Sequence, residues 1–147
     1  MFYFGNHMYI KKTLVISFTF LLVTHDYFTD VKGLSNLIWV WDMQDMSRDF
    51  EEYNPGDEYW DVFGFDVYDQ GFESSWYKYI LPIVGDKPMA IGECSKLPSS
   101  EMLASQPRWI FFMPWAELVK KANTRVEIQQ IYNDPRVITR DEMPGWN

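Results

Sequence analysis

The chain has 147 residues, of which 47% are hydrophobic and 18% aromatic, enough for one folded domain with a buried core. Its 13 Lys and Arg residues against 21 Asp and Glu residues give a formal charge of −8, so most of its surface would repel nucleic acid, which is excluded as a partner. A single cysteine excludes an internal disulfide, and two histidines supply too few nitrogen ligands for a zinc site.

Residues 1–25 form an anomalous N-terminal segment. Lys11 and Lys12 precede an apolar run over residues 13–23, which is the order of charged and apolar parts in a secretory signal. The run is too short to span a bilayer comfortably, so no stable membrane span is expected. The alternative is a buried helix of the domain that continues into residues 25–28, although the run's β-branched residues are mediocre helix formers. No small-residue cleavage site follows Val23, and both interpretations stay open.

From Gly33 onward, apolar segments of strand length alternate with amphipathic segments of helix length. Strands are predicted over residues 37–41, 62–65, 89–92 and 109–113, and helices over residues 76–84, 116–123 and 124–132. The first strand is continuously apolar and ends at Asp42, as expected for a parallel strand covered on both faces. Ser74 or Ser75 is the predicted cap of the first helix, and Pro82 shortens or kinks its end. This alternation indicates an α/β fold.

A long acidic loop over residues 42–58 separates the first two strands. It contains the run Asn54-Pro55-Gly56-Asp57, which is a turn signature. Its carboxylates lack the ligand spacing of a calcium loop, and scattered carboxylates are usually a solvated face. The sequence therefore predicts no metal site and no cofactor.

Polar and aromatic side chains follow the ends of several predicted strands. In a βα barrel the loops after the carboxyl ends of the strands build the active site, so Asp66, Tyr68, Glu93 and Trp115 are candidate functional residues. A retaining glycosidase needs one ionised carboxylate and one protonated carboxyl about 5 to 5.5 Å apart, and such a pair must come from two different strands.

Cys94 follows Glu93 directly and raises the alternative of a cysteine hydrolase. Such an enzyme needs a histidine beside its thiol, and His7 and His25 both belong to the N-terminal part of the chain. A buried structural thiol is the preferred interpretation.

Three segments together resemble a known family. Residues 36–41, 53–68 and 87–93 are similar to the fifth, sixth and seventh strand regions of family 26 glycoside hydrolases, the endo-β-1,4-mannanases. Residues 108–115 resemble the eighth strand and 137–144 the C-terminal end of that barrel, so the resemblance covers roughly residues 26–146. It implies a partial (β/α)8 TIM barrel, strands five to eight with their helices, within a domain over residues 26–147.

The resemblance implies roles for the strand-end residues. Glu93 would be the catalytic nucleophile, attacking the anomeric carbon of a mannosyl unit to form a glycosyl-enzyme intermediate. Tyr68 would hydrogen-bond near this nucleophile or the sugar, and Trp115 would be a stacking platform. The remaining candidate substrate contacts are Asp61 and Asp66, on the floor of the cleft, and Trp41, at a strand end. Both aspartates could equally be structural carboxylates that accept backbone N–H groups. A core position is the preferred interpretation for Trp39, Trp41 and Trp109, and Trp41 is the expected exception because it ends a strand.

The chain departs from the family pattern at the fourth strand, where members carry the acid/base glutamate. No such glutamate is found in this sequence, although residues 2–5 could be a remnant of the aromatic segment that follows it. The chain is therefore expected to be a truncated enzyme whose barrel, typically about 250 residues, cannot close. Its exposed edge strands would favour self-association, and mannanase activity would be small.

Two alternatives to a mannanase remain. One is an inactive carbohydrate-binding remnant that keeps Trp115 and Tyr68 as sugar contacts, and the other is a retaining hydrolase of another β-glycan. In each case the partner is β-mannan or a related polysaccharide. Cleavage of a polysaccharide requires a secreted, cell-surface or periplasmic protein, so one of these locations is expected.

Overall fold

The structure is a computed structural model that describes residues 19–45, 47, 49–68 and 71–145. The chain divides into two compact units. Residues 1–41 and 48–62 belong to the first unit, and residues 42–47 and 63–147 to the second.

The first unit contains short helical segments around aromatic side chains. Residues 19–26 are α-helical and lead into the π-helical turn η1 (Tyr27–Val31), and two 3-10 turns follow, η2 (Phe50–Tyr53) and η3 (Asp57–Tyr59). Trp41 and Trp60 are 4% and 3% exposed, with ring centroids 5.2 Å apart. Between the two turns, the predicted turn at 54–57 is present: the Asn54 side chain accepts the Gly56 N–H at 3.0 Å, and Gly56 has a φ of 110° that favours glycine.

The described part of the N-terminal segment is a helix with exposed or half-buried side chains. The prediction of a buried helix is therefore wrong for residues 19–26, where apolar Phe20 and Val23 are 74% and 62% exposed. The rest of the signal-like run lies outside the described residues. Within the described ranges, no helix has the length and apolar character needed to cross a membrane.

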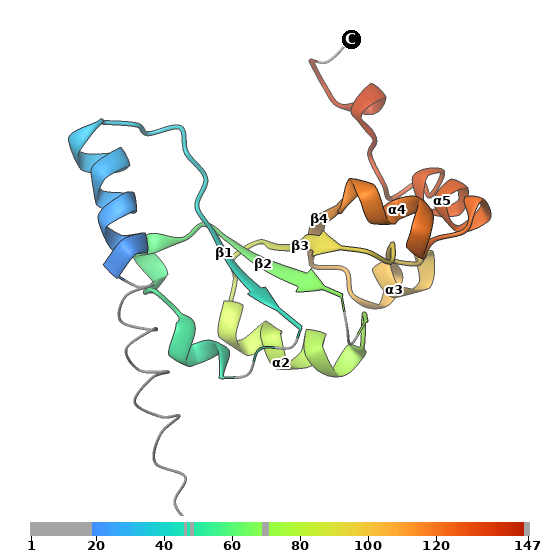
Figure 1. The fold of residues 1–147 in the computed structure, drawn as a ribbon, viewed down its shortest axis with the longest axis horizontal. Helices are drawn as coiled ribbons and strands as arrows, with labels where there is room; N and C mark the ends of the chain where they lie inside the picture. Colours follow the sequence, from blue (N-terminus) through green and yellow to red (C-terminus); the bar gives the residue numbers. More distant parts are fainter. Residues whose placement is uncertain (1–18, 46, 48, 69–70, 146–147) are drawn as a thin grey trace, which may run out of the picture. The chain divides into compact units, whose positions relative to one another are not determined.

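A four-stranded sheet with the order β1-β2-β3-β4 organises the fold (Figure 1). The strands are β1 (Val40–Gln44), β2 (Val62–Val67), β3 (Met89–Cys94) and β4 (Trp109–Pro114). The pairs β2–β3 and β3–β4 are parallel. Helices α2 (Ser74–Val84) and α3 (Ser100–Ser105) connect successive strands, and α4 (Ala116–Ala122), α5 (Arg125–Tyr132) and the 3-10 turn η4 (Arg140–Glu142) follow β4. This is the predicted α/β architecture of a partial (β/α)8 barrel.

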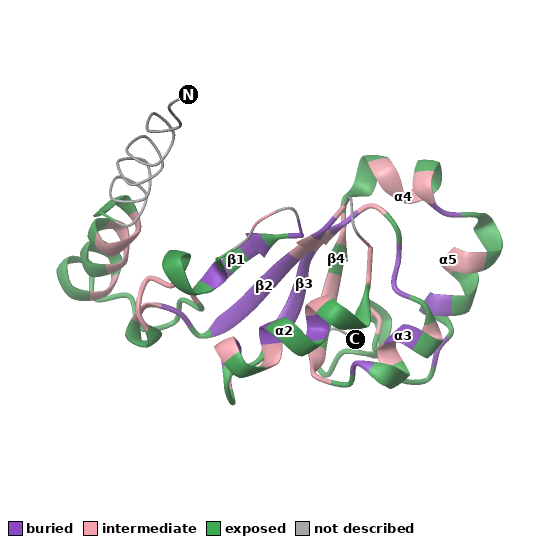
Figure 2. Ribbon diagram, turned by 90° about the horizontal axis from the view of Figure 1, so that it is seen from below, coloured by how far each residue is buried: buried purple, intermediate pink, exposed green. Residues whose placement is uncertain are grey.

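The core of the second unit lies on the two inner strands and on α2. Phe63 of β2, Met89 and Ile91 of β3 and Ile80 of α2 are each 0% exposed. Figure 2 shows β2 and β3 almost entirely in the colour of buried residues, whereas β4 carries intermediate and exposed residues. The continuous apolar sequences of the inner strands are explained by this burial on both faces.

Two sequence predictions about the elements need correction. The first strand covers Val40–Gln44 instead of residues 37–41, so Asp42 lies inside β1 and does not end it. Helix α2 begins at Ser74 with Glu73 in the cap position, without a side-chain cap from either serine. It contains Pro82 and ends at Val84, the predicted last residue. An apolar run indicates the approximate position of a strand, but the first and last residues of that strand depend on its pairing with strands distant in the sequence.

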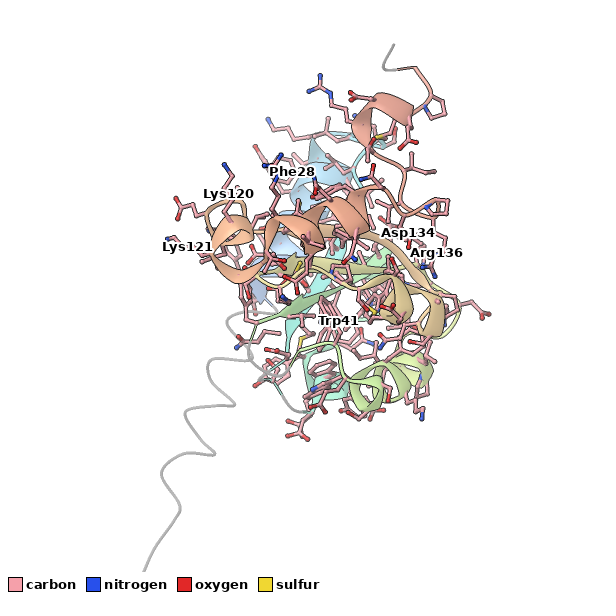
Figure 3. The ribbon with its side chains drawn as sticks, turned by 90° about the vertical axis from the view of Figure 1, so that its right-hand side faces the viewer. Phe28, Trp41, Lys120, Lys121, Asp134 and Arg136 are labelled. Carbon is pink, nitrogen blue, oxygen red and sulfur yellow. The ribbon has the colours of Figure 1, made fainter. Side chains whose placement is uncertain are left out.

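Helix α3 was missed by the sequence analysis, although it has a recognisable start. The Ser99 hydroxyl accepts the Met102 N–H at 3.1 Å, which is the capping interaction expected for serine at this position. Beyond α5, the Arg136 guanidinium donates to the Asp134 carboxylate at 2.7 Å, and both residues are labelled in Figure 3. Lys120 and Lys121 extend from α4 into solvent in the same view.

Candidate active site

The carboxyl ends of β2 and β3 bring three of the predicted site residues together. Asp66 of β2 is opposite Glu93 of β3 in the register of the sheet. Tyr68, just after β2, donates its hydroxyl to Glu93 Oε2 at 2.8 Å. These two strands are adjacent and parallel, so side chains at their carboxyl ends share one edge of the sheet.

The hydroxyl of Tyr68 remains a hydrogen-bond donor at every ordinary pH. Burial, followed by the hydrogen bond to Glu93, raises the pKa of Tyr68 to about 12. The tyrosine hydroxyl therefore stays protonated and donates its hydrogen bond to one oxygen of Glu93.

A buried aspartate, Asp45, fixes the end of β2. Its carboxylate accepts the backbone N–H of Tyr68 at 3.1 Å, and its own N–H donates to the Asp66 carbonyl at 2.9 Å. Asp45 is only 1% exposed. The prediction that the carboxylates of the acidic loop form a solvated face is thus wrong at Asp45, which is buried and accepts the N–H of Tyr68.

Asp42 adds a third carboxyl from β1. It forms a side-chain hydrogen bond with Asp66, whose carboxylate also accepts the backbone N–H of Glu93. Asp42 as a whole is exposed. Partial desolvation of its carboxyl by the surrounding protein, followed by the neighbouring Asp66 and Glu93 carboxylates, raises the pKa of Asp42 to about 7. Asp42 was not among the predicted site residues, because it was assigned to the acidic loop over residues 42–58, which was expected to be a solvated face.

Trp115 lies beside the end of β3. Its backbone N–H donates to the Cys94 carbonyl at 2.8 Å, and it occupies the N-cap position of α4. Its side chain is 47% exposed, which leaves an aromatic surface open. Cys94 itself is buried, as predicted, and burial followed by the nearby Asp66 raises the pKa of its thiol to about 12, so the thiol stays protonated.

Trp41 and Asp61 belong to the first unit, and each has local partners there. Trp41 is buried against Trp60. Asp61 precedes β2, at the amino end of that strand, and its carboxylate accepts the Trp39 N–H at 2.8 Å. These contacts match the structural roles that the sequence left open as alternatives, a core tryptophan and a carboxylate that accepts backbone N–H groups.

The second unit therefore gathers four polar residues toward the carboxyl ends of β2 and β3: Asp42, Asp66, Tyr68 and Glu93. Trp115 follows the next strand, β4. A carboxylate held by a tyrosine hydroxyl at the carboxyl end of a parallel strand is suited to nucleophilic or general-base chemistry. Over the part of the chain that the structure describes, no group of three or more His, Cys, Asp or Glu side chains could hold a metal ion.

Comparison with known proteins shows similarity to one family along nearly the whole chain. The family model described as glycosyl hydrolase family 26 matches residues 2–142. A mannan endo-1,4-β-mannosidase of Thermothelomyces thermophilus is 32% identical over 129 residues, which are 83% of this chain and 26% of that protein. A mannan endo-1,4-β-mannosidase of Bacillus subtilis is 29% identical over 133 residues, covering 82% of this chain and 35% of that protein.

Solved structures are similar over the same part of the chain. GH26A from Muricauda sp. MAR_2010_75 has a TM-score of 0.81 and 30% identity, over 86% of this chain and 44% of that chain. The GH26-CBM35 β-(1,4)-mannanase of Podospora anserina has a TM-score of 0.76 and 30% identity, over 88% of this chain and 30% of that chain. The chain thus spans less than half the length of each of these relatives.

Proposed function

The chain belongs to glycosyl hydrolase family 26, and we propose that its strand ends form the nucleophile side of a retaining, β-mannan-hydrolysing active site. The observation that carries this proposal is the hydrogen bond from Tyr68 to Glu93, at the carboxyl end of two buried parallel strands. Similar proteins named mannan endo-1,4-β-mannosidases support mannan as the substrate class.

In this proposal Glu93 attacks the anomeric carbon of a mannosyl unit. A bond forms between its carboxylate oxygen and that carbon while the bond to the leaving-group oxygen breaks, and water later hydrolyses the glycosyl-enzyme. Tyr68 orients the carboxylate through its O–H donor, and Asp66 accepts the backbone N–H of Glu93. Trp115, open to solvent beside the end of β3, would stack on a sugar ring.

The retaining reaction also needs an acid/base carboxyl, and the proposal assigns that role to no residue of this sequence. General acid catalysis typically contributes a factor of about 10² to 10⁴, so polysaccharide cleavage by the 147-residue chain should be weak. A substrate whose leaving group needs no protonation would separate the action of Glu93 from the missing acid.

A dinitrophenyl β-mannobioside is such a substrate, and the 147-residue chain is the enzyme to test. We expect release of dinitrophenolate with formation of a covalent mannobiosyl adduct on Glu93, identified by peptide mass spectrometry. Azide should accelerate turnover by displacing Glu93 from the anomeric carbon to give the β-glycosyl azide. Glu93→Gln should abolish both release and adduct, whereas equal release by this variant would contradict the proposal.

The alternatives have their own outcomes in the same assay. Faster reaction of the corresponding β-xyloside or β-glucoside would indicate a hydrolase of another β-glycan. Binding of mannooligosaccharides without dinitrophenolate release would indicate a carbohydrate-binding remnant that keeps Tyr68 and Trp115 as contacts. The substrate class also leads us to propose that the protein acts outside the cytoplasm, which fractionation of producing cells would test.

Self-association is a further part of the proposal, because both ends of the strand order are edges. Three apolar side chains of β4 are strongly exposed: Ile110 is 59%, Phe111 44% and Met113 57% exposed. Unpaired edges with exposed apolar residues favour pairing with another chain. Sedimentation velocity over a range of protein concentrations would detect such association, and a concentration-independent monomer would contradict it.

A further inference from the structure

Three carboxyl groups from three neighbouring strands meet at the proposed site. Asp42 comes from β1, Asp66 from β2 and Glu93 from β3. Asp42 and Asp66 share a side-chain hydrogen bond, and the charged groups that act on them are carboxylates: Asp66 and Glu93 on Asp42, and Glu93 and Asp45 on Asp66. If all three carboxyl groups were ionised, their negative charges would repel one another, and a proton on one of them would reduce this repulsion.

Gly92, which has no side chain, leaves room for the Asp42 carboxyl group beside the backbone of β3. A Cβ atom at position 92 would lie 2.6 Å from Asp42 Oδ2 and 2.8 Å from Oδ1, closer than real Cβ contacts allow. Gly92 is not among the glycines with a positive φ, so the backbone at this position would accept alanine. Gly92 directly precedes Glu93 in the chain, and a glycine is needed there because the Asp42 carboxyl occupies the space of a side chain.

A hydrogen bond between two carboxyl groups requires a proton on one of them. Two carboxyl groups in contact cannot both ionise without a large cost in free energy, because their negative charges repel. Such paired carboxyl groups therefore share a proton. The raised pKa of Asp42, about 7, is consistent with Asp42 as the group that holds the proton. Asp42 is an exposed residue, so its carboxyl can exchange this proton with water.

Asp66 transmits the effect of Asp42 to the nucleophile. Its carboxylate accepts from Asp42 on one side and from the backbone N–H of Glu93 on the other. One oxygen, Asp66 Oδ1, is buried without a hydrogen-bond partner, so the contacts of Asp66 are concentrated on its other oxygen. Losing the Asp42 donor would leave the half-buried Asp66 carboxylate with one hydrogen-bond donor fewer.

We propose that Asp42 is a positioning residue of this site: its protonated carboxyl donates to Asp66, and Asp66 in turn holds the backbone of Glu93. The Asp42 donor thereby supports Asp66 as the acceptor of the Glu93 N–H, and this contact fixes the backbone that carries the nucleophile. This inference rests on the proposed role of Glu93 as the nucleophile. It assigns to β1 a part in the reaction without contact with the substrate.

The protonation state can be measured on the 147-residue chain without any activity assay. Carboxyl 13C NMR should show one aspartate that titrates near pH 7, and this titration should disappear in Asp42→Asn. It should persist in the matched control Asp86→Asn, which removes an exposed carboxyl from the turn before β3. Assignment of the near-neutral titration to Glu93, or its persistence in Asp42→Asn, would overturn the inference.

Gly92→Ala provides a second, independent variant. The added methyl group must displace the Asp42 carboxyl, so the titration should move from near pH 7 toward the ordinary aspartate value of 3.8. Amide NMR spectra would establish that the variant is folded. An unchanged titration in folded Gly92→Ala would show that the contact with Gly92 does not determine the protonation of Asp42.

Kinetics on the activated mannobioside would distinguish positioning from a purely structural role. In the parent, kcat should fall above pH 7, because Asp42 loses the proton that it donates to Asp66. Asparagine donates a hydrogen bond at every pH, so Asp42→Asn should keep kcat within a few-fold at pH 5 and should not show this fall. Asp42→Leu removes the donor and should lower kcat on the order of 10- to 100-fold with little change in KM. Equal losses in both variants would contradict positioning through a proton.

Failure of the proposed function would look different. If dinitrophenolate release did not depend on Glu93 while the Asp42 titration near pH 7 remained, the protonated pair would stand and the nucleophile would be wrong. If release depended on Glu93 and no aspartate titrated near pH 7, the nucleophile would stand and the role of Asp42 would be wrong.

Discussion

Strands β3 and β4 are neighbours in one sheet and have similarly apolar sequences, yet their environments differ sharply. In β3, Met89, Ile91 and Cys94 are each 0% exposed, whereas in β4 Ile110 and Met113 are 59% and 57% exposed. β3 has a strand on each side, while β4 ends the strand order. Apolar sequence thus marks a strand suited to burial, and the neighbouring elements decide whether burial occurs.

The two strands also contribute different groups to the proposed site. β3 places Glu93 where Tyr68 and Asp66 can reach it, because β2 lies beside it in parallel register. β4 contributes Trp115 after its end, through the backbone contact with Cys94. The buried inner strand carries the carboxyl group of the proposed nucleophile, and the outer strand is followed by an exposed tryptophan.

The largest expected contrast comes from the same substitution on the two strands. Ile91→Ala should lower the free energy of unfolding by about 2 to 5 kcal/mol, because it leaves a cavity in a fully buried position. Ile110→Ala should change it by about 0.5 kcal/mol or less, since that side chain is largely exposed. Urea unfolding followed by tryptophan fluorescence measures both. Equal losses would mean that β4 is buried in solution.

The next effect concerns Asn123, which ties the loop after β3 to the helix after β4. Its Oδ1 accepts the Leu97 N–H at 2.8 Å, and its Nδ2 donates to the Ser95 and Val119 carbonyls at 2.8 and 2.9 Å. Asn123→Ala should cost about 1 to 3 kcal/mol, because buried backbone groups lose their partners.

A second asparagine provides the control for this link. Asn133 is exposed and donates to the Gln129 carbonyl in the helix that it ends. Asn133→Ala should therefore cost about 0.5 kcal/mol or less in the same urea titration. If the two substitutions cost the same, the loop after β3 does not depend on α4.

Helix caps should respond alike on the two sides of the comparison. Ser99 caps α3, which follows β3, and Thr124 forms a capping box with Glu127 at the start of α5, beyond β4. Ser99→Ala and Thr124→Ala should each lower the free energy of unfolding by about 1 kcal/mol, because a cap is a local interaction. Thermal unfolding by circular dichroism measures this. A cost at Ser99 several times that at Thr124 would show that the cap is coupled to the buried strand.

The smallest effect on stability is expected from a charge on β4. Met113→Lys should leave the free energy of unfolding within about 0.5 kcal/mol of the parent, since the side chain is already exposed. It should nevertheless reduce concentration-dependent association in sedimentation velocity, because an edge lysine disfavours strand pairing between chains. Unchanged association together with large destabilisation would place Met113 inside the fold.

The sequence alone determined the number and order of the strands and the two polar residues, Tyr68 and Glu93, that the structure joins by a hydrogen bond. Periodicity and strand-end position were sufficient, since both are local properties of the chain. The same local logic found α4 and α5, and it overlooked α3, whose serine cap was a usable signal.

Only the tertiary structure decided the roles of Asp42 and Asp45. Both lie in a segment whose composition indicates a solvated loop, yet Asp42 pairs with Asp66 and Asp45 accepts the N–H of Tyr68. These partners are more than 20 residues away in the chain, so no local pattern contains them. The burial and pKa of a carboxyl depend on which strands pack beside it, and that arrangement exists only in the folded sheet.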